Sequence, residues 1–247
     1  MSSPRDLTPT SFALLGLLAM KPWTTYELAQ QMDRTLSRFW PRARSKLYVE
    51  PKKLVAHGLA RASKDAVGRR SRTVYSITPK GRRALAAWVA QPGAGPVLEF
   101  EQLLKVFFAE NGTRDDVLRT LRDLRAWVHV RTLVNVEVAR SYQEGRGLFP
   151  ERAAITTVVG RFLDDFLESL DRWAEWATAV VEAWPECPRD AQPDWAGLEE
   201  SVRQSTARAA RWRAAGGQVT SDAPRRRSPH LTEAGCASSA ANRSRHS

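Results

Sequence analysis

Residues 45–58 read Ser-Lys-Leu-Tyr-Val-Glu-Pro-Lys-Lys-Leu-Val-Ala-His-Gly, and this stretch decides the fold. Leu47, Leu54 and Val55 recur at the spacing of an amphipathic helix, so we expect them to form its inner face. Gly58 is well placed to end the helix, because glycine adopts the left-handed conformation at low cost. The stretch therefore predicts one helix with an apolar side and a basic side.

The basic side of this predicted helix carries groups that suit DNA. If the leucines point inward, the opposite face is formed by Ser45, Lys46, Val49, Lys52 and Lys53. Lysine contacts phosphates or guanine edges, and serine contacts either. Tyr48 has two readings, either covering the core or offering its hydroxyl to a phosphate. Pro51 removes one backbone hydrogen bond, so we expect a kink or an irregular turn there.

The segments on either side complete a recognisable order of elements. Thr8-Pro9 is a cap-plus-proline start for a first helix, and Thr24 with Glu27 forms a capping box for a second that ends near Arg38. Two short strands, 59–64 and 72–77, follow the helix of residues 45–57. A fourth helix begins at Thr78-Pro79 and reaches about Ala90. Three helices, a hairpin and a helix are the order of a winged helix-turn-helix.

Arginines flank the helix and crowd the hairpin tip. Arg42 and Arg44 precede the helix and suit phosphate contacts, while Arg69, Arg70 and Arg72 suit a wing lying on the backbone or in a narrow minor groove. Residues 40–90 hold 13 Lys/Arg and 2 Asp/Glu, a net +11. Residues 201–247 hold +7, which leaves the rest of the chain at −7 within the total of +11. Charge concentrated in this way indicates a polyanionic partner.

The chain beyond residue 97 is predicted to be helical. Helices are expected at 98–111, 113–145 and 151–184, and the last has a common apolar face of Ile155, Val159, Phe162, Phe166, Leu170, Trp173, Ala177 and Val181. Two long helices with one apolar stripe each form only a thin layer in one copy of the chain. We therefore interpret this region as a dimerisation arm that buries its stripes against a second copy.

These patterns predict a mainly α protein with a small β-wing. The expected organisation is a winged helix-turn-helix domain at 1–91, a linker at 92–97, a helical dimerisation or effector domain at 98–185, a short helix within 186–215, and a disordered basic tail at 216–247. The arginines of the tail, such as Arg225, either add unspecific DNA affinity or belong to an inert extension.

Several function classes are excluded by what the sequence lacks. The two cysteines and four histidines have no zinc spacing, and we expect neither a metal nor a cofactor. No glycine-rich phosphate loop and no Gly-x-Ser-x-Gly elbow occurs, so we expect no enzyme. The longest apolar run, Phe12 to Met20, is too short to span a bilayer, and the N-terminus lacks a signal peptide. The expected compartment is the cytoplasm, with no membrane partner.

Five segments, in order, carry a family resemblance. They are Leu14-Leu15-Gly16-Leu17-Leu18, Tyr26-Glu27-Leu28, Ser45-Lys46-Leu47-Tyr48, Leu54-Val55-Ala56-His57-Gly58-Leu59 and Tyr75-Ser76-Ile77-Thr78-Pro79-Lys80-Gly81. At this spacing they resemble the PadR family of transcriptional regulators over about residues 8–90. The length after the linker is similar to the longer branch of that family, whose C-terminal domain resembles that of virulence-activator regulators.

The resemblance implies a homodimer that binds an inverted-repeat operator in double-stranded DNA, usually as a repressor. It places Ser45, Lys46, Tyr48 and Lys52 on the recognition helix and residues 69–72 on the wing. The alternative is a winged-helix module that binds protein without specific DNA binding. The basic bias of the third helix and the wing argues against that alternative.

Tryptophans of the long helices raise a second question. PadR relatives often respond to small aromatic compounds, and Trp127, Trp173 and Trp176 lie in the predicted dimerisation region. These side chains either line an effector pocket or pack in a core or interface. The sequence leaves both possibilities open.

Overall fold

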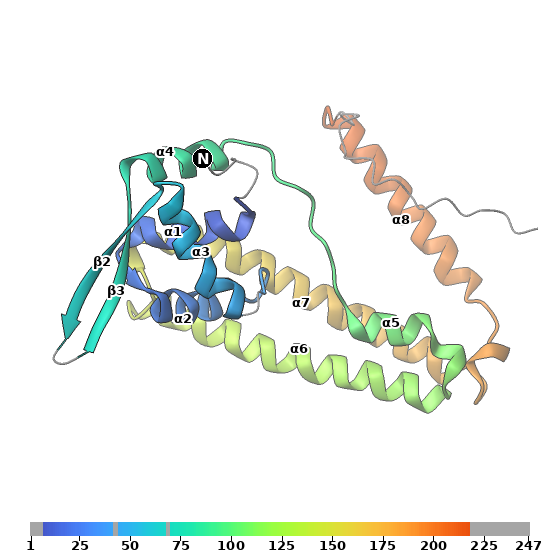
Figure 1. Ribbon diagram of the computed structural model, residues 1–247. Helices are drawn as coiled ribbons and strands as arrows, with labels where there is room; N and C mark the ends of the chain where they lie inside the picture. The colour runs from blue at the N-terminus through green and yellow to red at the C-terminus, as the bar shows by residue number, and fades with distance from the viewer. Residues whose placement is uncertain (1–6, 42–43, 68–69, 218–247) are drawn as a thin grey trace, which may run out of the picture. The chain divides into compact units, whose positions relative to one another are not determined.

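The computed structural model describes residues 7–41, 44–67 and 70–217, with the side chains at 44–46, 66–67 and 70–71 left out (Figure 1). The chain divides into two compact units, Met1–Leu98 and Glu99–Ser247. The predicted linker at 92–97 lies within residues 92–100, which have no regular secondary structure. The first unit contains all the strands of the described residues, and the second is helical.

The first two helices begin where the sequence predicts and are fixed by capping boxes. Helix α1 spans Pro9–Met20, and Thr8 and Ser11 exchange side-chain-to-backbone hydrogen bonds at its start. Helix α2 spans Thr25–Thr35, where Thr24 and Glu27 do the same. Such caps satisfy backbone N–H groups that have no partner within the helix. Helix α2 ends three residues before Arg38, the predicted end.

A two-residue strand between these helices was not expected from the sequence. Strand β1, Trp23–Thr24, pairs antiparallel with the hairpin, with Trp23 opposite Tyr75. Trp23 is 7% exposed and its ring N–H donates to the Leu17 carbonyl at 2.8 Å. Two residues are too few to show the alternation of a strand, so the sequence does not predict this element.

Helix α3, Arg44–Ala56, forms as predicted but continues through its proline. Pro51 is among the most buried residues of the chain, and it lies on the same side as Leu47 and Leu54. The helix is therefore not interrupted by an irregular turn at this position, and a kink stays a prediction. Packing of the ring in the core accompanies the loss of one backbone hydrogen bond.

The hairpin is longer than the sequence indicated. Strand β2 spans Ala60–Val67 and strand β3 spans Arg70–Ile77, so the two strands reach further toward the tip than the predicted 59–64 and 72–77. The described sheet has the order β1-β3-β2 and is antiparallel throughout. In Figure 1 the hairpin extends beyond the helices of its unit as a wing.

The second unit is built from two long helices. After α5, Glu101–Phe107, and a 3₁₀ turn at Ala109–Asn111, helix α6 runs over Arg114–Gln143 from a capping box at Thr113. A second 3₁₀ turn, Pro150–Arg152, leads into α7, Ala153–Glu182. The helix predicted at 98–111 is in fact α5 followed by a separate 3₁₀ turn. The helix predicted from residue 151 begins two residues later, as α7.

Helices α6 and α7 pack along each other as an antiparallel pair, as their order of contacts shows. Near the start of α6, Val117 and Leu121 cluster with Ala177 and Val181, which lie near the end of α7. Further along α6, the contacts move to earlier residues of α7, in a second cluster of Leu124, Val128, Leu167 and Ala174. Figure 1 shows the two helices side by side along most of their length.

The stripe that α7 buries within the chain differs in part from the predicted one. Its buried residues are Leu163, Leu167, Ala174, Ala177 and Val181. Ile155, Val159 and Phe162, which belong to the predicted common face, are 56%, 37% and 60% exposed in the single chain. Two neighbouring apolar stripes run along this helix, and periodicity alone does not separate them.

Candidate nucleic-acid interface

Helix α3 presents an exposed face opposite its buried leucines. Leu47 and Leu54 are 1% and 0% exposed, whereas Tyr48 is 44% and Val49 is 63% exposed. Lys52 is also exposed. Tyr48 is thus accessible from solvent, so its hydroxyl can reach a phosphate. This face has the mixture of cationic, hydroxyl and small apolar groups that reads a DNA groove.

Hydroxyl groups of α1 hold α3 in place. The Ser11 hydroxyl, in a fully buried residue, donates to the Glu50 carboxylate at 2.6 Å. One residue earlier, Thr10 accepts a hydrogen bond from the Trp40 ring N–H at 3.1 Å, which fixes the segment leading into α3. Glu50 is also 3.8 Å from the Lys53 ammonium, whose side chain is 28% exposed. Lys53 is therefore a weaker candidate for DNA contact than Lys52, because part of its charge is already compensated.

The C-terminus of α3 is clamped by the Thr-Pro-Lys-Gly segment. Thr78 donates to the Gly58 carbonyl at 2.7 Å, and Lys80 donates to the His57 carbonyl at 2.9 Å. A Cβ at Gly81 would lie 2.1 Å from the Leu59 carbonyl oxygen, so only glycine allows this approach. The ammonium of Lys80 also lies at the negative end of the α3 dipole, which stabilises this contact. The segment joins the recognition helix to the wing and to α4, Pro79–Val89.

Not all the predicted DNA-contacting residues can be placed. Arg42 and Arg69 lie outside the described residues. Arg44, Ser45 and Lys46 lie in α3, and Arg70 lies in β3, but their side chains are outside the described set. Their roles stay predictions.

Arg72 is engaged within the wing. Its guanidinium donates to the Asp65 carboxylate at 3.0 and 2.8 Å, and the two residues are directly opposite in the sheet register. Both side chains are about half exposed. An exposed pair of this kind contributes little stability and can be exchanged for a phosphate. The sequence prediction had listed the arginine without its partner, which the strand register reveals.

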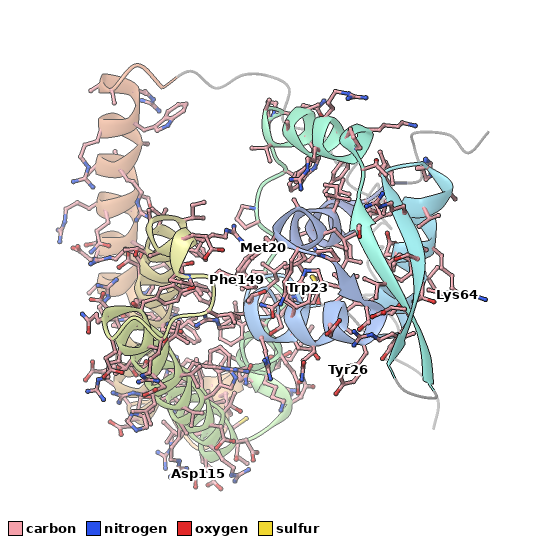
Figure 2. The ribbon with its side chains drawn as sticks, turned by 90° about the vertical axis from the view of Figure 1, so that its left-hand side faces the viewer. Met20, Trp23, Tyr26, Lys64, Asp115 and Phe149 are labelled. Atoms are coloured by element: carbon pink, nitrogen blue, oxygen red, sulfur yellow. The ribbon has the colours of Figure 1, made fainter. Side chains whose placement is uncertain are left out.

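Two further cations of the wing were missed by the sequence reasoning. Arg61 and Lys64 lie on β2 and are exposed. Figure 2 shows Lys64 at the outer side of the hairpin, pointing away from the sheet. Strand alternation could have predicted the position of Arg61, because it places Arg61 on the same face as Arg72, away from buried Tyr75.

Glu27 strengthens the turn between β1 and α2. The Thr24 backbone N–H donates to its carboxylate at 2.7 Å. The hydrogen bonds from Thr24 hold the pKa of Glu27 below its ordinary value, with the charges of Arg72 and Lys21 adding to the effect. Glu27 therefore stays ionised beside these cations, and its carboxylate caps the start of α2.

The three candidate ligand-binding tryptophans have different surroundings. Trp173 packs against both helix-pair clusters, with its ring edge-on to Phe100 at 6.2 Å. Trp127 is 41% exposed, with the Arg131 guanidinium 5.3 Å from its ring, and Trp176 is 51% exposed. A groove of about 480 Å³ between α6 and α7 is lined by none of them, but by Asp115, Leu118, Arg119, Arg122, Arg125, Thr178 and Glu182.

The described residues hold no candidate metal site and no candidate membrane span. In the part of the chain that the structure describes, no three His, Cys, Asp or Glu side chains gather in a way that could hold a metal ion. None of the helices placed there is long and apolar enough to cross a membrane.

The order of elements, the wing and the clamped α3 define a winged helix-turn-helix protein. Residues 14–87 match the family described as transcriptional regulator PadR-like. The N-terminal unit is therefore similar to the PadR-like family of transcriptional regulators over this stretch, which is less than a third of the chain.

Two curated relatives point the same way. A probable transcriptional regulator of Mycobacterium tuberculosis is 32% identical over 81 residues, which cover 32% of this chain and 43% of the relative. The negative transcriptional regulator PadR of Bacillus subtilis is 25% identical over 114 residues, 45% of this chain and 63% of the relative. The chain thus spans less than two thirds of each. The matched family and both relatives are transcriptional regulators, not enzymes.

Solved structures share the fold. Bacillus subtilis PadR in complex with operator DNA has a TM-score of 0.59 at 20% identity, over 70% of this chain and 99% of that one. The Vibrio cholerae virulence activator AphA gives 0.53 at 22%, over 70% and 98%. Bacillus subtilis PadR with p-coumaric acid gives 0.53 at 21%, over the same shares. Identities this low show the fold alone, and membership of the longer branch stays a prediction.

Proposed function

We propose that this protein is a sequence-specific regulator of transcription that binds double-stranded DNA as a homodimer. Helix α3 enters the major groove and the β2–β3 wing lies on the backbone or in the minor groove. The observation that carries the proposal is the exposed face of α3 with Tyr48, Val49 and Lys52, on a PadR-like domain. The clamps from Ser11, Thr78 and Lys80 support it, since they fix the helix that reads the bases.

The operator is an inverted repeat and the regulator acts as a repressor. Two-fold symmetric dimers bind pseudo-palindromic sites, with half-sites about one helical turn or a multiple of it apart. The relative from Bacillus subtilis is a negative regulator, and its crystal structure has been solved in complex with operator DNA. Both facts favour the same role for this chain.

The homodimer is formed by α6 and α7. Large apolar side chains stay exposed on both helices, including Val130 and Leu133 on α6 and Val158 and Phe162 on α7, at 56–73% exposure. Exposed apolar surface on this scale marks an interaction site. A second copy of the same two-helix layer covers it and supplies the symmetry that an inverted repeat requires.

Genome fragments captured by the purified protein at physiological salt test the proposal. We expect enrichment of one palindromic site, lost in a Lys46→Ala/Lys52→Ala/Arg70→Ala variant. The control is Arg83→Ala/Lys105→Ala/Arg172→Ala, which removes the same charge from exposed positions on α4, α5 and α7 and should retain the site. Uniform weak capture by all three proteins would favour the alternative, a winged-helix module that binds protein.

A small aromatic effector is a second proposal. Bacillus subtilis PadR has been solved with p-coumaric acid, and Trp127 and Trp176 are accessible on the long helices here. We propose that a planar aromatic acid binds near them in the dimer and releases DNA, whereas Trp173 contributes by holding the helices together. Quenching of Trp fluorescence that disappears in Trp127→Phe/Trp176→Phe would support this. No quenching across a broad panel of aromatic acids would contradict it.

A further inference from the structure

Helix α8, Trp195–Ala214, has ends that are set by its own sequence. The Asp194 carboxylate caps its start by accepting from the Gly197 N–H at 3.0 Å. At its end Gly216 has a φ of +79°, and the Gly217 N–H donates to the Trp212 carbonyl at 3.1 Å. These are the cap and the left-handed stop of a defined helix. Figure 1 draws it as one continuous rod.

One side of α8 is an apolar seam that stays largely exposed in the described part of the chain. Trp195, Leu198, Val202 and Trp212 are 48–65% exposed, and no residue of the helix is buried. The seam follows a 3–4 spacing through Trp195, Leu198, Val202, Ser205, Ala209 and Trp212. A strict stripe of this kind is the narrow seam of a coiled coil, whereas helices that lie on a membrane need a broader apolar face.

The charges of α8 are divided between its halves. The first half carries three acids, Asp194, Glu199 and Glu200, and one cation, Arg203, which pairs with Glu200, so its net charge is −2. The second half carries Arg208, Arg211 and Arg213 and no acid. Two such helices side by side in parallel would place like charges together. In the antiparallel arrangement each acidic half meets a basic half, and opposite charges flanking a seam set the orientation.

The seam also has the symmetry that antiparallel self-pairing requires. When the partner helix runs in the opposite direction, Trp195 meets the partner's Trp212, Leu198 meets the partner's Ala209, and Val202 meets the partner's Ser205. All six seam positions are then used, and a large side chain faces a small one in the two inner layers. We propose that α8 pairs antiparallel with α8 of a second copy of this chain, adding a self-contact beyond that of α6 and α7.

Linkage to the second unit compensates for the shortness of the helix. A seam of three heptads with Ser205 and Ala209 is weak by itself. Two copies that are already held together by another contact present their helices at millimolar effective concentration, which is enough for weak pairing. The pairing thus rests on the proposed homodimer of α6 and α7 but not on DNA binding, so loss of the operator site alone would leave it standing.

Disulfide mapping tests the orientation directly. The variant Leu198→Cys/Ala209→Cys is made in a Cys187→Ser/Cys236→Ser background and oxidised with glutathione disulfide. Residues 198 and 209 lie about 16 Å apart along one helix, so a bond between them joins two chains. We expect cross-linked chains, with peptide mapping showing bonds between residue 198 and residue 209. Adding Trp195→Ala and Trp212→Ala should lower the linked fraction severalfold.

The matched control places the cysteines on the outer face of the same helix. Ala207→Cys/Ala214→Cys, at exposed positions away from the seam, should give almost no links. Bonds of 198 to 198 and 209 to 209 would overturn the antiparallel arrangement. Links no more frequent than in the control would overturn pairing altogether. That result would instead favour packing of α8 against its own chain, where a Cβ at Gly197 would lie 3.2 Å from Trp176.

Discussion

The two units of this protein treat their apolar residues differently. In the first unit, Leu14, Leu28, Leu47 and Leu54 are at most 1% exposed, so three helices close one core within one chain. In the second unit, two helices share a single row of contacts, and side chains such as Val158 stay 73% exposed. A layer of two helices can bury only the faces that meet each other. The first unit is therefore complete by itself, and the second is expected to need another copy.

The largest effect should come from opening the core of the first unit. Leu54→Ala removes a fully buried side chain from α3 and should cost about 2–5 kcal/mol of unfolding free energy. Hydrogen exchange of peptides from residues 7–98 measures the loss of stability in the first unit. DNA binding should fall as well, because Leu54 anchors in the core the helix whose opposite side is basic.

The control for this change lies on the second unit. Leu104→Ala trims a side chain that is 59% exposed on α5 and should change the unfolding free energy by less than about 0.5 kcal/mol. A comparable loss at both positions would show that the exposed leucine is buried in solution, and the contrast between the units would need revision.

A charge on the exposed stripe should break the dimer without unfolding the chain. Phe162→Glu places a carboxylate where a second copy is expected to pack, since Phe162 is 60% exposed in the single chain. Sedimentation should then report a monomer with unchanged helix content. Affinity for a palindromic site should drop on the order of 100-fold, because two linked half-site contacts become independent.

Ala179→Glu is the matched change at an exposed position of α7 that lies about 100° around the helix from Phe162. It should leave both mass and affinity unchanged. A dimer that survives Phe162→Glu would contradict the assignment of this stripe to self-association.

The same contrast explains what the sequence could and could not predict. On α6, Val117, Leu121, Leu124 and Val128 are buried at a 3–4 spacing, so periodicity alone identifies this face. On α7 the predicted common face includes Ile155 and Phe162, which are exposed in the single chain, and a neighbouring stripe is the one buried against α6. Periodicity identifies apolar faces, but it does not say which neighbour covers each one.

The recognition surface shows a similar limit. The exposed positions Val49 and Lys52 followed from the spacing of Leu47 and Leu54, which local helix geometry fixes. Strand β1, the long wing and the pairing of Arg72 with Asp65 did not follow, because they depend on strand register. The hydrogen bond from Ser11 to Glu50 joins residues 39 positions apart and has no local signal.

Removing that hydrogen bond should have an intermediate effect. Ser11→Ala leaves the Glu50 carboxylate, 14% exposed, without its buried donor, and a bond to a charged group contributes about 1.5–3 kcal/mol. We expect loss of stability in the first unit and several-fold weaker DNA binding, with the dimer intact. A double-mutant cycle with Glu50→Ala isolates the pair, and additive effects would show that the bond does not position α3.

The smallest effect should come from the wing, where the ion pair between Arg72 and Asp65 contributes little to stability. Asp65→Asn removes the acid that occupies Arg72, and both side chains are about half exposed, so stability should change by less than about 1 kcal/mol. Freed Arg72 can then neutralise a phosphate, so DNA affinity should rise modestly and fall more steeply with salt, by about one unit of slope. Binding measured across a salt series reports both. If the slope is unchanged while Arg72→Ala leaves affinity intact, the wing touches no DNA at this position.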